Sequence, residues 1–169
     1  MMTIIRAFSA RRALLRFRSD TWRSLLGELD RRGERRREAG AFLLADWQGN
    51  SRVVNHVVYL DDLDPDCLQG GICFDGRAYS SWDICEARQA RVIGDVHTHP
   101  EGVRQSDIDR DNPMIARSGH VALIVPDLAA RDVAPGDVGV HLYSGTAGWE
   151  SWTGRDAARR LYVGRWPGR

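Results

Sequence analysis

The chain contains 169 residues with a formal net charge of +1, and 43% of its residues are hydrophobic while 28% are charged. This length suits one hydrophobic core, so we expect a single domain over residues 1–169. The near-neutral charge gives no bias toward nucleic acid, and no apolar run approaches the roughly 20 residues of a membrane-spanning helix. Neither nucleic acid nor a membrane is therefore expected as a partner.

The cysteines favour a reducing compartment. Cys67, Cys73 and Cys85 are odd in number and form no C-x-x-C pair, which argues against a disulfide framework or a cysteine-rich zinc site. Arginines interrupt the apolar N-terminal stretch, so a signal peptide is not expected. We expect a cytoplasmic protein.

The first half of the chain alternates strand and helix patterns. Residues 12–18 predict a strand, after which Ser19 or Asp20 would cap a helix. Apolar residues then recur at i, i+3, i+4 and i+7, which predicts a helix with one buried face that ends near Gly33. These residues are Trp22, Leu25, Leu26 and Leu29. Further on, the pattern predicts a hairpin of residues 41–46 and 51–60 around a turn at 48–50, a surface loop at 61–71 and a helix at 77–90.

Strands dominate the second half. They are predicted at residues 91–99, 120–126 and 138–144, followed by an edge strand at 147–153 and a terminal helix at 155–163. This order of elements indicates an α/β fold in which a mixed sheet is sandwiched between helices.

A His-x-His pair ends the strand at 91–99. His97 and His99 are two residues apart, so their side chains leave the same face of the strand and can converge on one metal ion. Ser106 is a good N-cap for a following helix in which Asp109 occupies the N3 position, which brings its carboxylate back toward the histidines. Two imidazoles and one carboxylate leave a fourth position for water, which is typical of a catalytic zinc site.

Two further aspartates near Ser106 are alternative carboxylate ligands. The Ser-x-x-Asp spacing favours Asp109, with Asp107 as the rival ligand and Asp111 as a more distant one. The remaining histidines are isolated on predicted strands and are expected to be packed or surface residues. They are His56, His120 and His141.

The segment HTHPEGVRQSDID at 97–109 resembles the metal-binding signature of the JAB1/MPN/Mov34 (JAMM) metallopeptidase family, which runs His, Ser or Thr, His, Pro, a short loop, Ser, two residues, Asp. The family also has an upstream E-x-x-G-x-L-x-G segment, which EAGAFLLA at 38–45 resembles with Glu38 in the glutamate position. Two departures are evident. The loop between Pro100 and Ser106 is one residue shorter than expected, and two alanines replace the glycines.

The resemblance implies a fold and a site. The fold would be the MPN (cytidine-deaminase-like) fold, with a mixed curved sheet between helices. His97, His99 and Asp109 would bind Zn²⁺, Glu38 would act as general base and then general acid, and Ser106 would donate to the oxyanion. Without the resemblance, Glu38 is simply a surface carboxylate beside the basic cluster at 31–37.

The resemblance also implies an activity. Similar enzymes are metallopeptidases or isopeptidases that cleave amide bonds at the C-terminus of a ubiquitin-like protein, and compact bacterial forms resemble enzymes of antiphage conjugation systems that also contain E1-like and E2-like proteins. The expected substrate is a ubiquitin-like protein or its conjugate, extended along a sheet edge, with residues 61–76 as a possible flap. Alternatives are processing of a sulfur-carrier tail, a non-catalytic MPN scaffold and a nuclease-associated relative of the RadC type.

Overall fold

The computed structural model describes residues 13–49, 52–68 and 79–165. Within these residues, six strands form a mixed sheet in which β4 and β5 are parallel and the other neighbours are antiparallel. In spatial order they are β3 (His56–Tyr59), β2 (Gly40–Asp46), β4 (Ala90–Thr98), β5 (Val121–Val125), β6 (Gly139–Tyr143) and β7 (Trp149–Trp152). A smaller parallel sheet pairs β1 (Leu15–Arg18) with β8 (Leu161–Gly164).

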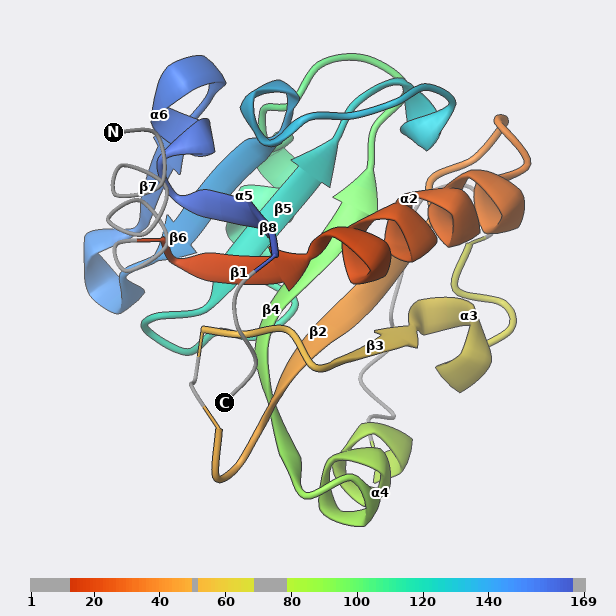
Figure 1. Ribbon diagram of the computed structural model, residues 1–169, viewed down its shortest axis with the longest axis vertical. Coiled ribbons are helices and arrows are strands. Elements are labelled where there is room, and N and C mark those ends of the chain that lie inside the picture. The colour runs from red at the N-terminus through yellow and green to blue at the C-terminus, as the bar shows by residue number, and fades with distance from the viewer. Residues whose placement is uncertain (1–12, 50–51, 69–78, 166–169) are drawn as a thin grey trace.

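Helices cover the six-stranded sheet, as the sequence predicted. The longest, α2 (Ser19–Gly33), crosses the near face in Figure 1, whereas α5 (Asp107–Asp111) lies behind the sheet. The other helices are α3 (Leu60–Leu63), α4 (Tyr79–Ala87) and α6 (Gly154–Ala158), with short 3₁₀ turns η1 (Asp127–Ala129), η2 (Pro135–Asp137) and η3 (Gly145–Ala147). No helix among the described residues is both long and apolar enough to span a membrane.

The apolar stripe of α2 packs into the core as expected. Trp22, Leu25 and Leu29 are buried, and Trp22 stacks edge-on against Phe17 of β1. The predicted N-cap was wrong, because the helix already includes Ser19 and its N-cap, Arg18, makes no side-chain capping bond. Acidic charge in the first turn still favours the helix N-terminus.

The hairpin was predicted correctly, but its second strand is shorter than expected. β2 pairs antiparallel with β3, in the register Leu44↔His56. Residues 52–55 precede the strand, and residues 50 and 51 lie outside the described residues. Here the chain instead bonds to β1, where the backbone N–H of Val54 donates to the carbonyl of Arg16.

The expected surface loop at 61–71 is correct only in part, because residues 61–63 belong to a helix whereas residues 64–68 form a turn. The chain forms α3, and the apolar Leu60, Cys67 and Leu68 are buried in the core. The acidic residues at its start bind the end of α2, where the guanidinium of Arg32 donates to Asp61 at 2.6 Å and Asp62 at 2.8 Å. The proposed flap falls partly on residues 69–78, which lie outside the described residues, as does Cys73.

The C-terminal helix is also shorter than predicted. It ends at Ala158, and the following residues form β8 instead, with Leu161 opposite Leu15 of β1. Leu161 is almost fully buried. Pairing with β1 and burial of Leu161 in the core therefore outweigh the local helical pattern.

Candidate metal centre

The end of β4 and the residue that follows it place both predicted histidines on one side of the sheet. His97 lies between β2 and β5, opposite Gly40 on one side and Ile124 on the other, and both histidines are buried. Thr98 points the other way and has its own role, which the sequence did not reveal. Its backbone N–H donates to the carbonyl of Ala39, and its hydroxyl accepts from the N–H of Ala39. These two bonds hold the residue next to Glu38 against the histidine strand.

The ligand atoms of His97, His99 and Asp109 converge. The two histidine Nε2 atoms are 3.0 Å apart, His97 Nε2 lies 3.6 Å from Asp109 Oδ1, and His99 Nε2 lies 3.3 Å from Asp109 Oδ2. Ligand atoms about 2.0–2.2 Å from a tetrahedral zinc would be about 3.3–3.6 Å apart. The three side chains therefore have the chemistry and nearly the spacing of a zinc site, and among the described residues no other cluster of this kind is found.

A capping box holds Asp109 in place. Ser106 is the N-cap of α5, as predicted, and its hydroxyl accepts from the N–H of Asp109. The Asp109 Oδ2 atom in turn accepts from the backbone N–H of Ser106 at 2.7 Å and from its hydroxyl at 2.8 Å. Asp107 and Asp111 are exposed and are not part of the cluster.

Asp95 is a further residue of the site that the sequence reasoning missed. Its side chain is buried, with Oδ1 2.5 Å from His120 Nε2 and Oδ2 3.9 Å from His97 Nδ1. A carboxylate behind the far nitrogen of a metal-binding histidine orients the ring. Burial raises the pKa of Asp95, but the bonds to His120 and His97 outweigh it and keep that pKa below its ordinary value. The Asp-x-His-x-His alternation could have revealed it, because these side chains share a strand face.

Electrostatic attraction between the histidines and the carboxylates stabilises the cluster. Burial lowers the pKa of His97, yet the carboxylates of Asp109 and Asp95 outweigh this and raise it to about 9. Burial raises the pKa of Asp109, but the two histidines and Ser106 bring it well below its usual range. Without metal, His97 is therefore protonated at neutral pH and forms an ion pair with an ionised Asp109.

Glu38 lies at the edge of the cluster, with Oε1 3.9 Å from His99 Nε2 and its side chain 27% exposed. Two of the neighbouring arginines have other partners, because Arg35 pairs with Asp30 and Arg37 with Glu34. Among the described residues, no arginine forms an ion pair with Glu38. The carboxylate is thus placed beside the ligand atoms and remains open to solvent.

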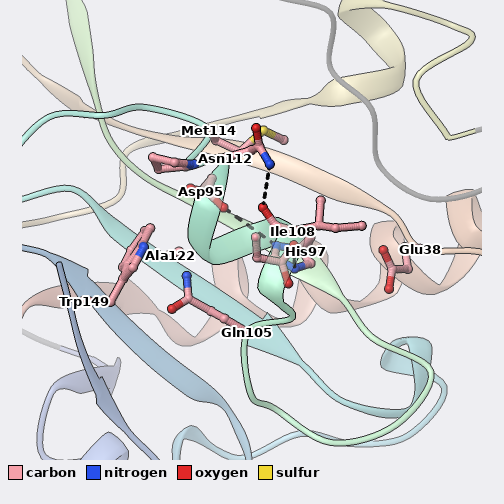
Figure 2. A pocket seen from close by; sticks show the side chains of 11 residues that line it. Glu38, Asp95, His97, Gln105, Ile108, Asn112, Met114, Ala122 and Trp149 are labelled. Atoms are coloured by element: carbon pink, nitrogen blue, oxygen red, sulfur yellow. Dashed lines mark hydrogen bonds and ion pairs between the residues drawn. The ribbon is translucent and has the colours of Figure 1, made fainter.

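A pocket of about 380 Å³ adjoins the cluster, and both Glu38 and His97 line it (Figure 2). Its other walls are partly apolar, with Ile108, Met114 and Trp149 among the lining residues. Ile108 is 74% exposed although it is a large apolar residue. The arrangement combines a possible metal site, a carboxylate for proton transfer and an apolar surface for a ligand.

Comparison with known proteins bears on the fold. No protein-family model matches this chain. A protein from Desulfitobacterium hafniense has a similar structure, with a TM-score of 0.64 and 16% identity over 88% of this chain and 92% of that one. A JAB1/MPN domain protein from Archaeoglobus fulgidus has a TM-score of 0.51 and 16% identity, over 88% and 96% of the two chains. A protein from Salinibacter ruber has a TM-score of 0.52 and 16% identity, over 80% and 87%.

These likenesses show that the chain has the fold of JAB1/MPN domain proteins, with a mixed sheet flanked by helices. The fold that was expected from the sequence is confirmed. At 16% identity the comparison shows the fold alone, so the activity has to be argued from the side chains of the site.

Proposed function

We propose that this protein is a zinc-dependent metallopeptidase of the JAMM type that hydrolyses an amide bond at the C-terminus of a ubiquitin-like protein. The observation that carries the proposal is the cluster of His97, His99 and Asp109, whose ligand atoms lie within 4.8 Å of one another, with Glu38 beside it. A fold alone would not support an activity, since one fold hosts many functions.

The donor set fits zinc. Two neutral imidazoles and one carboxylate are the ligands of catalytic zinc sites, which keep one coordination position for water or substrate. Zinc held by these residues would polarise a substrate carbonyl and make a water molecule more acidic. Asp95 would orient His97, and the capping box would hold the carboxylate of Asp109.

The protein's own residues would move the protons. Glu38, solvent-accessible and free of arginine partners among the described residues, would accept a proton from the attacking water and deliver it to the leaving amine. Ser106 would stabilise the oxyanion of the tetrahedral intermediate by donating a hydrogen bond. Because its hydroxyl donates to Asp109 Oδ2 in the structure, this role requires the hydroxyl to turn toward the substrate.

The proposed substrate is a ubiquitin-like protein or its conjugate, and E1-like and E2-like proteins of the same conjugation system would be further partners. An extended C-terminal tail could bind along a sheet edge, as peptides commonly do. The pocket supports this view, because Trp149 of the edge strand β7 lines it next to the candidate metal centre. A bacterial antiphage conjugation system and a cytoplasmic location are part of the same proposal.

Zinc content and hydrolysis test the proposal together. We expect one zinc per chain by elemental analysis, and cleavage of a ubiquitin-like protein that carries a C-terminal amide-linked extension, with both lost in the His97→Ala, His99→Ala double variant. Less than half an equivalent of zinc after dialysis against trace zinc would contradict the metal site. Full zinc occupancy without cleavage of ubiquitin-like or sulfur-carrier fusions would instead indicate a non-catalytic scaffold.

A further inference from the structure

The segment that carries Asp109 has little packing of its own. The five-residue helix α5 contains no buried residue. Within the described residues, the loop at 100–105 forms no backbone–backbone hydrogen bond with any other segment. Such a segment would be expected to move, because few buried contacts and few hydrogen bonds mark regions of low local stability. Yet Asp109 must be held at a defined distance from two histidines that belong to the rigid sheet.

Among the residues that the structure describes, His141 of β6 makes the one hydrogen bond that joins this loop to another segment. Its side chain is buried, its Nε2 lies 3.0 Å from the carbonyl oxygen of Val103, and its Nδ1 lies 2.8 Å from the hydroxyl of Ser151 in β7. A carbonyl oxygen only accepts, so Nε2 carries the proton and Nδ1 accepts from Ser151. Burial lowers the pKa of His141, which agrees with a neutral ring. The carbonyl of Val103 thereby fixes the tautomer, and the hydroxyl of Ser151 is compatible with it because a hydroxyl can donate to Nδ1.

Gly139 of β6 leaves space for the loop to approach the sheet. A Cβ atom on Gly139 would lie 2.0 Å from the carbonyl oxygen of Val103 and 2.7 Å from His141 Nε2. No side chain fits in that space, so the loop carbonyl can approach the backbone of β6 only because residue 139 is glycine. The close approach and the hydrogen bond act at the same carbonyl.

A second side chain from the sheet holds the other side of Asp109. Trp149 Nε1 of β7 donates to the carbonyl oxygen of Arg110 at 3.1 Å. His141 and Trp149 therefore bind the chain six residues before and one residue after the candidate ligand. Of these two, His141 is not among the residues that line the pocket, so its effect can be separated from contact with a ligand.

We propose that His141 is a positioning residue of the metal centre, which sets the place of Asp109 by holding the carbonyl of Val103 against β6. The effect of His141 on zinc binding rests on the proposed function. Its effect on the order of the loop and of α5 does not depend on zinc. The side chain of His141 thus holds the shortened loop after Pro100 against the sheet.

Two substitutions separate the bonds of His141. Asparagine places an amide near the position of Nδ1 and can keep the contact with Ser151, but it is too short to reach Val103. Glutamine extends an N–H donor toward the position of Nε2 and can keep the bond to Val103. We expect His141→Asn to weaken zinc binding by about tenfold to a hundredfold, the range for lost outer contacts of metal ligands, and His141→Gln to recover most of that loss. Competition with a zinc chelator measures both.

Amide hydrogen exchange of the metal-free protein provides the second readout. The amides of Ser106, Asp109 and Arg110 are bonded within the capping box and the first turn of α5. In His141→Asn their exchange should be at least about tenfold faster, as expected when a local opening becomes easier, while β2 and β4 keep their protection. His141→Gln should exchange like the wild type.

A destabilised control tests whether the effect is local. Leu25→Ala removes a buried side chain of α2 and should lower the melting temperature without changing zinc affinity or exchange at residues 106–110. Wild-type affinity and exchange in His141→Asn would overturn the proposal, as would equal losses in Leu25→Ala at a matched melting temperature. If the wild type binds no zinc, the proposed function fails, and the exchange comparison alone decides the role of His141.

Discussion

His97 lies between two carboxylates, Asp95 and Asp109, and this position controls how the site should respond to pH. Burial lowers the pKa of the imidazole, but the carboxylates raise it to about 9. In the metal-free protein the raised pKa contributes stability that is fully present below the ordinary histidine pKa of about 6.5 and is lost as the pH rises toward 9. The same proton must leave before a metal can bind.

Zinc affinity is therefore expected to depend steeply on pH. Between pH 7 and 9 the apparent association constant should rise by about tenfold per pH unit, because each zinc displaces one proton, and it should level off above pH 9. Chelator competition at a series of pH values measures this slope. A constant affinity over that range would show that His97 is neutral in the metal-free protein.

Glu38 is expected to affect turnover but neither folding nor zinc binding. Glu38→Gln keeps the shape of the side chain but removes its ability to carry a proton, so hydrolysis should fall by about a hundredfold or more while zinc content and melting temperature stay unchanged. Turnover, metal content and melting curves of the same variant would be compared. A small loss of stability with normal turnover would instead indicate a structural carboxylate.

At the level of elements, α5 separates the two candidate aspartates. Asp109 faces the histidines and is held by Ser106, whereas Asp107 points to solvent in the first turn. Asp109→Asn should weaken zinc binding far more than Asp107→Asn, because only the first removes a charged ligand atom. Chelator titration of both variants decides this. Equal losses would mean that the metal takes its carboxylate from a different residue.

Elements with a strong local pattern were predictable. The stripe of α2, the strand predicted at residues 91–99 and the N-cap at Ser106 all follow from the spacing of nearby residues, and the structure confirms them, with β4 at Ala90–Thr98. The failures involve distant partners. Leu161 belongs to a strand because β1 lies beside it, and the acidic start of α3 is ordered because Arg32 reaches it from α2. Neither partner can be identified from local periodicity.

The candidate site shows the same limit. His97, His99, Asp109 and Glu38 were named from motif spacing, and the structure brings them together. Asp95 could have been named, because it shares a strand face with the histidines, but its bond to His120 and the bond of the Val103 carbonyl to His141 could not, because both partners come from distant segments of the chain. From the sequence, His120 and His141 were expected to be packed or surface residues, and only the order of strands in the sheet shows what they contact.

For the whole molecule, zinc should act as a link between two parts of the fold. One histidine lies in β4 in the centre of the sheet and the other directly follows that strand, whereas Asp109 comes from α5, which has no buried residue. The unfolded chain has no preformed site, so zinc would bind only the folded state. Free zinc at about 100 times its dissociation constant should therefore add about 2.7 kcal/mol to the free energy of unfolding. The melting temperature should rise accordingly with zinc and fall again with a chelator. The His97→Ala, His99→Ala double variant is the control, and its melting temperature should not respond to zinc. An equal response in that variant would place the metal elsewhere, and no response in the wild type would argue against a zinc site at this cluster.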